Sequence, residues 1–296
     1  MSGLEVIFLI GFWAWAVSAL VFLRNTFLPR LPLTSSPSLL NLPSETVHFL
    51  ATDGAQLEGW ILPSHPIRPW VILCHGLGSN RTDLLELAGG LHRANFNLLL
   101  FDFRGHGGSS GRTSSFGWLE QRDLEGVLAF LGQRSPAHPY GVYGVSMGGA
   151  VALMVAESDE RIGAMAVDSV YTNLEEALAR HLKLLYPMIP REPFLSFILL
   201  TYRLRFSIWP RQVSPKNSTA HLSPRPLLLI HGAQDHRMPL EGARQTYARA
   251  GEPKELWVVD QAGHLEAFAL DPAQYLERLV TFFESSLQRK PVLMYE

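Results

Sequence analysis

The segment Tyr140–Ala156, YGVYGVSMGGAVALMVA, places one serine between glycines inside an apolar run. An apolar stretch that continues into small residues and a second apolar stretch predicts a buried strand turning directly into a helix. The turn falls at Gly144–Gly148, GVSMG, with Ser146 at its centre. This context matches a G-x-S-x-G elbow, which presents a serine oxygen at a helix N-terminus. The five-residue pattern also arises by accident, so the rest of the chain must supply partners for Ser146.

Buried strands and helices alternate along most of the chain. The expected buried strands are Trp70–Gly76, Asn97–Gly105, Tyr140–Ser146, Ile162–Ser169, Pro226–Gly232 and Lys254–Asp260. The expected helices begin at Thr82 and Leu240 or span Phe116–Gln133, Met147–Glu157 and Pro272–Leu287. Two β-like runs around Asp53–Gly54 predict a hairpin before them. The alternation predicts the α/β class, with a mostly parallel central sheet, helices on both faces, and chemistry at the carboxyl ends of the strands.

Composition excludes several classes of function. The chain has 296 residues, a formal net charge of -2, and 18% charged residues, so no global field favours a nucleic-acid partner. The single cysteine, Cys74, excludes an intramolecular disulfide and a multi-cysteine metal site. No H-E-x-x-H, phosphate-loop or dinucleotide motif is present. We therefore expect no metal and no cofactor, while the sequence gives no indication of oligomeric state.

A serine hydroxyl becomes a useful nucleophile only beside a base. In chains with a G-x-S-x-G elbow the partners follow in the order Ser, Asp, His. His264 lies in the short loop QAGH after the last buried strand, where it can reach across the strand ends. Its alternative interpretation is a loop histidine at the start of a helix. We expect His264 to be the base.

A carboxylate must orient that base and stabilise its protonated form. The aspartates between the serine and the histidine are Asp159, Asp168, Asp235 and Asp260. Asp235 follows a buried strand in the loop HGAQDHRMP, and this loop leads into the layer that carries His264. Asp168 ends the strand after the elbow and is the rival candidate. We expect Asp235 to be the acid.

Acyl transfer also needs donors for a developing oxyanion. The stretch His75–Gly78, HGLG, follows a buried strand and gives a glycine-flanked loop that a substrate can approach closely. The expected donors are the backbone N–H groups of Leu77 and of Met147, the residue after the serine. We expect His75 to brace the loop and Cys74 to pack inside the strand.

Taken together, these motifs resemble the α/β-hydrolase superfamily, and most of all its bacterial serine hydrolases with an N-terminal membrane anchor. The resemblance covers about residues 45–288 and rests on HGLGSN, DFRGHGGSSG, GVSMGG, HGAQDHRMP and AGH, in family order. It implies an α/β-hydrolase fold and a catalytic triad of Ser146, Asp235 and His264. By the same resemblance, the loop Asp102–Gly107 braces the site.

The first segment differs from the rest of the chain. Val6–Leu23 is apolar and uncharged, close to the roughly 20 residues that cross a bilayer as a helix. A cleaved signal peptide fits poorly because no Lys or Arg precedes the run, and a core helix fits poorly because the segment has no polar face. We expect a transmembrane anchor at residues 1–28, a Pro- and Ser-rich linker at residues 29–44, and a hydrolase domain at residues 45–290. Arg24 and Arg30 after the span place that domain in the cytoplasm by the positive-inside rule.

A long insert separates the strand at Ile162–Ser169 from that at Pro226–Gly232. Residues 172–222 are too many for a structureless loop, and two helical runs are expected at Leu174–Tyr186 and Phe194–Phe206. By the family resemblance this insert is a helical cap over the active site. It carries seven cations and three acids. Its basic, apolar character fits contact with anionic lipid, but a solvated basic face is the preferred explanation of the charge.

The sequence thus predicts a serine hydrolase that cleaves carboxylic ester or thioester bonds through an acyl-enzyme on Ser146. The expected substrate is a small-molecule or lipid-like acyl compound, and the expected partner is the membrane. The alternatives are an acyltransferase or peptidase with the same triad, and an inactive membrane-bound interaction protein. Because the linker carries no motif, removal of residues 1–30 is expected to leave a soluble, active domain.

Overall fold

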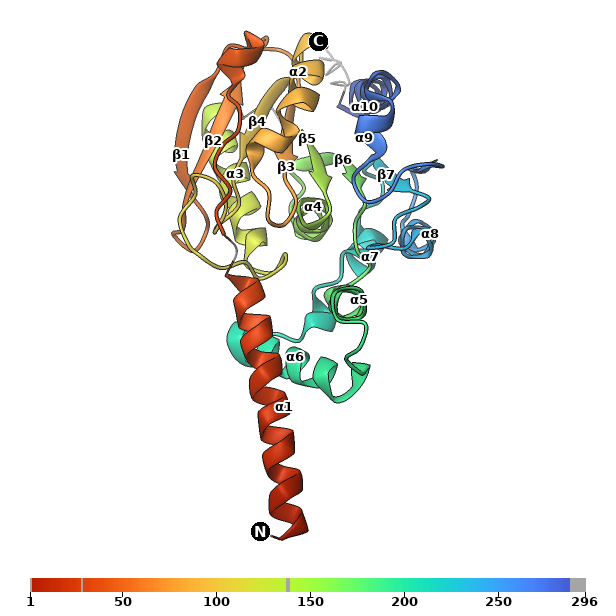
Figure 1. Cartoon of the computed structure of the whole chain (residues 1–296). Coiled ribbons are helices and arrows are strands. Elements are labelled where there is room, and N and C mark those ends of the chain that lie inside the picture. The colour runs from red at the N-terminus through yellow and green to blue at the C-terminus, as the bar shows by residue number, and fades with distance from the viewer. Residues whose placement is uncertain (1, 28, 137–138, 288–296) are drawn as a thin grey trace.

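The computed structural model describes residues 2–27, 29–136 and 139–287 (Figure 1). Positions 137–138 and 288–290 of the expected hydrolase domain, and residues 1 and 28 of the expected anchor, lie outside the described residues. In the described part of the chain, eight strands form one sheet in the order β1-β2-β4-β3-β5-β6-β7-β8. The strands are β1 (Glu45–Leu50), β2 (Gln56–Leu62), β3 (Trp70–Cys74), β4 (Asn97–Phe101), β5 (Tyr140–Val145), β6 (Ile162–Asp168), β7 (Leu227–Gly232) and β8 (Lys254–Val259). Strand β2 runs antiparallel to both β1 and β4, and the pairings from β4 to β8 are parallel. The predicted α/β class with a mostly parallel sheet is confirmed.

Helices cover both faces of the sheet, so the central strands are buried on both sides. Every residue of β3, β4 and β5 is buried, as expected for uninterrupted apolar strands. One apolar cluster lies between the sheet and helices α2 and α10, and the other lies beneath α3, α4 and α8 (Figure 1). The helices are α1 (Gly3–Thr26), α2 (Leu85–Arg93), α3 (Glu120–Arg134), α4 (Met147–Ser158), α5 (Leu174–Leu185), α6 (Arg191–Phe206), α7 (Pro215–Ser218), α8 (Leu240–Arg249), α9 (Ala267–Leu270) and α10 (Pro272–Leu287). Short 3₁₀ turns are η1 (Pro37–Leu40), η2 (Arg81–Leu84), η3 (Pro210–Gln212) and η4 (Thr219–His221).

The helix expected at Phe116–Gln133 starts later than the sequence predicted. Helix α3 begins at Glu120, and the buried Glu120 carboxylate accepts hydrogen bonds from backbone and hydroxyl groups of Ser114, Ser115 and Gly117. These bonds hold residues 114–117 in a loop, in which Phe116 has a φ of 58°. The prediction was wrong here because apolar periodicity does not register a glutamate that binds the preceding backbone.

The insert between β6 and β7 folds into α5, α6, η3, α7 and η4. Figure 1 shows α5 and α6 beyond the carboxyl ends of the strands, with α6 next to the upper half of α1. Helix α6 packs directly against α1. This segment, residues 172–222, is called the cap below.

Helix α1 is the one described helix long and apolar enough to cross a membrane, with a mean hydropathy of 2.4 over its best window. A signal sequence or a core helix of a soluble protein satisfies the same criteria, but only 18% of that window is buried. The exposed part projects alone, whereas the C-terminal part joins the domain (Figure 1). There Ser18, Ala19, Phe22 and Thr26 form a buried stripe at helical spacing.

Candidate active site

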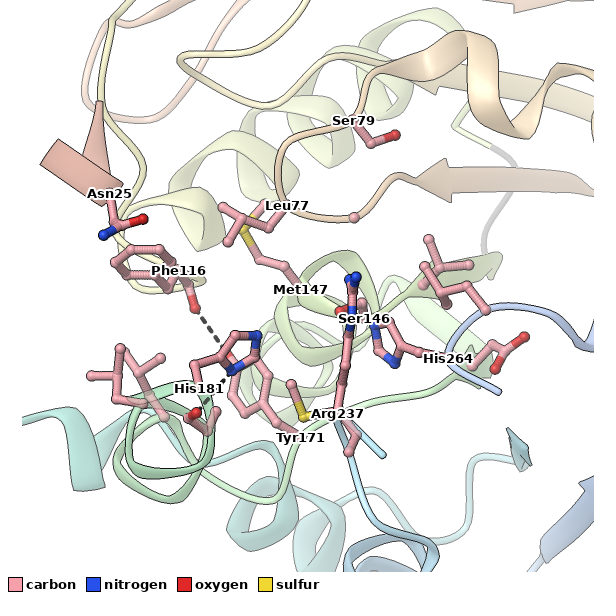
Figure 2. Close-up of a pocket in the computed structure, with 18 of the residues that line it drawn as sticks. Asn25, Leu77, Ser79, Phe116, Ser146, Met147, Tyr171, His181, Arg237 and His264 are labelled. Atoms are coloured by element: carbon pink, nitrogen blue, oxygen red, sulfur yellow. Dashed lines mark hydrogen bonds between the residues drawn. The ribbon is translucent and has the colours of Figure 1, made fainter. Parts of the chain in front are cut away.

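Strand β5 and helix α4 meet at Ser146 in a strained turn. Ser146 has a φ of 49° and a ψ of -115°, which an L-residue adopts only where the surroundings enforce it. Its N–H donates to the Asp168 carbonyl at 2.8 Å, which fixes the turn against the end of β6. The turn directs the hydroxyl side of Ser146 toward a cavity at the carboxyl ends of the strands (Figure 2).

Glycine is required on both sides of this serine. A Cβ on Gly144 would lie 2.6 Å from the Gly149 nitrogen, and a Cβ on Gly148 would lie 2.3 Å from the Cys74 carbonyl oxygen. Both obstacles are backbone atoms that cannot move aside. The G-x-S-x-G spacing therefore reflects the close crossing of β3, β5 and α4.

Asp235 and His264 come from the two loops that follow β7 and β8. The Nδ1 atom of His264 donates to Asp235 Oδ2 at 2.7 Å. The other carboxylate oxygen accepts the backbone N–H groups of Arg237 and Met238, each at 2.8 Å. Burial raises the pKa of Asp235, but the hydrogen bond from His264 and the backbone donors outweigh it, so the pKa of this carboxyl lies below its ordinary value. Asp235 is thus held ionised against the imidazole.

Asp168, the rival acid, has different partners. Its carboxylate is fully buried and accepts hydrogen bonds from the hydroxyl groups of Ser169 and Tyr275, each at 2.8 Å. Tyr275 in turn shares a hydrogen bond with Tyr143. Burial raises the pKa of Asp168 above its ordinary value. The structure therefore pairs His264 with Asp235 and places Asp168 in a neighbouring buried network.

The loop after β3 brings Leu77 to the edge of the same cavity as Met147. Met147 is the first residue of α4, so its N–H has no partner within the helix. Within the part of the chain that the structure describes, the Leu77 N–H makes no hydrogen bond. Both expected oxyanion donors thus lie at the cavity, and neither backbone N–H has a hydrogen-bond partner among the described residues.

Two buried histidines brace this loop. His75 Nδ1 donates to the Gly76 carbonyl at 2.7 Å, and His75 Nε2 accepts the Phe103 N–H at 3.0 Å. His106 Nε2 accepts the Gly78 N–H at 3.1 Å. Burial lowers the pKa of His75 to about 3, so this ring stays neutral and serves as a fixed acceptor. The loop Asp102–Gly107 therefore contacts the HGLG loop directly.

The cavity at the carboxyl edge has a volume of about 530 Å³, the size of a small-ligand site. Ser146 and His264 both line it, although no hydrogen bond links their side chains among the described residues (Figure 2). Most of the remaining walls are apolar and come from α1, α2, α5, α6 and the loop at Phe116. No cluster of three His, Cys, Asp or Glu side chains suited to a metal ion occurs in residues 2–27, 29–136 and 139–287.

Comparison with known proteins agrees with this architecture. Residues 65–195 match the family described as serine aminopeptidase, S33. The uncharacterized protein YfhR of Escherichia coli K12 is 32% identical over 252 residues, which cover 82% of each chain. The chain belongs to the α/β-hydrolase superfamily. The uncharacterized protein Rv2307c of Mycobacterium tuberculosis is 31% identical to this hydrolase and covers 85% of it, with 83% of its own length matched.

Among solved structures, this hydrolase is similar to an esterase. The esterase Pf2001 of Pyrococcus furiosus superposes with a TM-score of 0.74 and 27% identity, covering 88% of this chain and 98% of its own. The predicted α/β-hydrolase fold is confirmed by this match and by the sheet order.

Sequence reasoning missed several residues that line the site. Arg237 follows Asp235 by two positions, and Figure 2 shows its side chain extending toward Ser146. Val21, Phe22 and Asn25 of the N-terminal helix also line the cavity. Arg237 belongs to the HGAQDHRMP motif, so its proximity to the site could have been predicted from the sequence. The contribution of the N-terminal helix had no sequence signal, because a pocket wall and a lipid-facing surface are equally apolar.

Proposed function

We propose that this α/β-hydrolase cleaves carboxylic esters or thioesters through an acyl-enzyme on Ser146, with His264 as the base and Asp235 as the acid. The observation that carries the proposal is the His264–Asp235 hydrogen bond of 2.7 Å at a cavity that Ser146 also lines. The apolar walls favour an acyl chain over a charged peptide terminus. The likeness to the Pyrococcus furiosus esterase supports the same reaction type.

In the first half-reaction, Ser146 Oγ attacks the carbonyl carbon while His264 Nε2 accepts the hydroxyl proton. The carbonyl oxygen becomes an oxyanion, which the N–H groups of Leu77 and Met147 stabilise. When the tetrahedral adduct collapses, the bond to the alcohol or thiol breaks and His264 returns the proton to that leaving group. Asp235 holds the imidazole in the required tautomer and stabilises its protonated form.

In the second half-reaction, His264 removes a proton from water, and the resulting hydroxide attacks the acyl carbon. The bond to Ser146 Oγ breaks, the carboxylic acid leaves, and the serine regains its proton from His264. An acyltransferase would use another hydroxyl, amine or thiol in place of this water. The family description as a serine aminopeptidase makes peptide cleavage the other alternative with the same residues.

Replacement of Ser146 by alanine tests the assignment directly. We expect ester turnover by the Ser146→Ala protein to fall by several orders of magnitude, since loss of a nucleophile removes most of the catalytic effect. A fluorescent phosphonate should label the wild-type protein and not the variant, which also separates an active hydrolase from an inactive interaction protein. Retention of substantial turnover in a folded Ser146→Ala protein would exclude the proposed triad.

The function includes attachment to a membrane through α1. Residues 1–28 act as an anchor, residues 29–44 connect it to the hydrolase domain at 45–290, and Arg24 and Arg30 favour a cytoplasmic domain. Full-length protein is expected to stay with the membrane fraction after a high-salt wash, because burial of an apolar helix is insensitive to ionic screening. Release into the supernatant would contradict the anchor.

A further inference from the structure

The N-terminal helix forms part of the wall of the cavity. Val21, Phe22 and Asn25 line the same space as Ser146 and His264. Figure 2 places Asn25 beside Phe116, on the opposite side of Ser146 from His264. One helix therefore carries both the apolar surface suited to a bilayer and a wall of the active-site cavity.

This position of α1 is held by specific contacts. The Thr26 carbonyl accepts the Ser114 N–H at 3.0 Å, and Thr26 is fully buried. The Phe22 ring lies 6.1 Å from that of Phe116 and 6.0 Å from that of Tyr202 in the cap. Tyr202 also donates a hydrogen bond to the backbone of the loop at Phe116. Anchor, cap and core thus meet at one loop.

The free length of α1 is too short to span a bilayer on its own. The first fully buried residue of α1 is Ser18, and half-buried positions precede it from Gly11 on, which leaves at most Gly3–Val17 to project. At 1.5 Å per residue these 15 residues extend about 22 Å. The hydrocarbon core of a bilayer is about 30 Å thick. If α1 spans the membrane, the hydrocarbon also surrounds the turns of α1 that contact the cap.

The edge of the cap has the surface that such a depth requires. The turn after α5 and the outer side of α6 expose large apolar side chains, with Met188 93%, Leu204 67% and Leu185 60% exposed. Basic residues flank them, including the exposed Lys183 and Arg205. Apolar side chains bordered by cations are typical of surfaces that enter the interface of an anionic membrane.

The cavity reaches this apolar edge. Leu185 and Tyr186 are exposed at the end of α5 and also line the cavity. On the facing side, the exposed Asn25 of α1 lines it as well. The cavity therefore extends from the exposed end of α5 and from α1 to Ser146, and its walls are mostly apolar.

We propose that the cap enters the bilayer beside α1 and that the cavity receives the acyl chain of a membrane lipid ester along the wall formed by Val21, Phe22 and Asn25. This inference rests on the proposed ester cleavage at Ser146 and names its substrate class. The lipid moves laterally from the bilayer between α1 and α5, so its acyl chain need not cross water.

A fluorophore on the cap measures how deeply the cap enters the bilayer. An environment-sensitive fluorophore is attached to a cysteine at position 188 in the full-length Met188→Cys protein, and the Ile67→Cys protein labelled in the same way is the control. The native Cys74 is buried and therefore protected from the label. Ile67 is 69% exposed and precedes β3, so it lies at the amino ends of the strands, opposite the carboxyl ends that carry the cavity. In vesicles of phosphatidylcholine and phosphatidylglycerol, we expect the label at 188 to shift to the blue and to be quenched by spin-labelled lipid tails. Water-like emission and no quenching at 188, as at 67, would overturn the proposal.

The wall formed by α1 is tested by adding bulk to it. Val21→Trp should lower the ratio of palmitate to acetate ester turnover by at least about tenfold, because a filled apolar pocket discriminates by chain size. Leu20→Trp is the matched control, since Leu20 is 69% exposed and absent from the cavity. Asn25→Trp changes an exposed wall residue with less risk to folding and should act in the same direction. Equal ratios in Val21→Trp, Asn25→Trp and the wild type would overturn the proposal.

These readouts separate the two levels of inference. The fluorescence depth does not depend on chemistry, and phosphonate labelling of Ser146 reports the proposed function. A protein that neither reacts with phosphonate nor cleaves any ester refutes the function. A protein that cleaves esters but keeps its chain-length ratio in the wall variants refutes only the lipid route.

Discussion

At the scale of single residues, two aspartates at or near the candidate site lie in contrasting surroundings. Asp235 is surrounded by donors, and its carboxylate stays ionised beside His264. Asp168 is buried against the tyrosine hydroxyl of Tyr275, and burial raises its pKa. Both follow buried strands, so chain position favours Asp235 but does not exclude Asp168. Their hydrogen-bond partners do so.

This contrast predicts different outcomes for two matched substitutions. Asp235→Asn should lower kcat by about 10,000-fold, because an amide no longer fixes the tautomer of the histidine. Asp168→Asn should have a much smaller effect, since its amide oxygen can still accept from Tyr275 or Ser169. Ester turnover and thermal stability of both variants provide the measurement. A larger loss of kcat in a stable Asp168→Asn protein would show that the acid is misassigned.

At the scale of elements, the β1–β2 hairpin is tied to the loop that braces the site. Asp53 at the hairpin turn binds Arg104 through two contacts of 2.8 Å, and Arg104 also binds the buried Asp123. The hydrogen bonds from Arg104 are the largest influence on Asp53 and lower its pKa from 3.8 to about 2. The hairpin thus stabilises the Asp102–Gly107 loop through charge.

The lowered pKa of Asp53 gives a pH dependence of defined sign. A carboxyl group with a folded pKa below its unfolded value stabilises the protein above the unfolded pKa, and this contribution is lost as pH falls from about 4 to about 2. Asp53→Asn should therefore reduce the urea midpoint at pH 6, with a difference from the wild type that shrinks between pH 4 and pH 2. The exposed Asp260→Asn controls for loss of one charge. A difference that stays constant with pH would contradict this role.

The sequence predicted the elements that carry strong local signals. The elbow at Ser146, the strands that end beside it and the helix at Pro272–Leu287 follow from apolar runs and glycine positions. The start of α3 was missed because Glu120 binds the loop before it. Pairing of His264 with Asp235 could be favoured from chain order, but only tertiary packing shows which carboxylate meets the imidazole.

At the scale of the whole molecule, the N-terminal helix joins three parts of the chain. Its exposed side matches the expected anchor, while its buried stripe packs on the cap and on the loop at Phe116. The residues that follow also contact the domain, since the Leu31 and Pro32 carbonyls accept hydrogen bonds from Asn80. The uniformly apolar composition of α1 did not indicate that the helix also packs against the cap and the loop at Phe116. The only sequence trace is the small or polar character of Ser18, Ala19 and Thr26, which suits close helix packing.

This arrangement reverses the expectation that residues 1–30 are dispensable. Their removal deletes the buried Phe22 and Thr26, and loss of one buried phenylalanine side chain typically costs about 3–5 kcal/mol. It also opens the cavity to water on the α1 side. Removal of residues 2–17 takes away the mostly exposed part of α1, with a few half-buried positions such as Trp15, and keeps the fully buried stripe. We expect the shorter deletion to preserve both the melting temperature and cleavage of acetate esters, and the longer one to lower both. Thermal unfolding and ester turnover of the two truncated proteins in the same detergent provide the comparison. If the two proteins are equally stable and active, α1 is an anchor alone and contributes nothing to the active-site cavity.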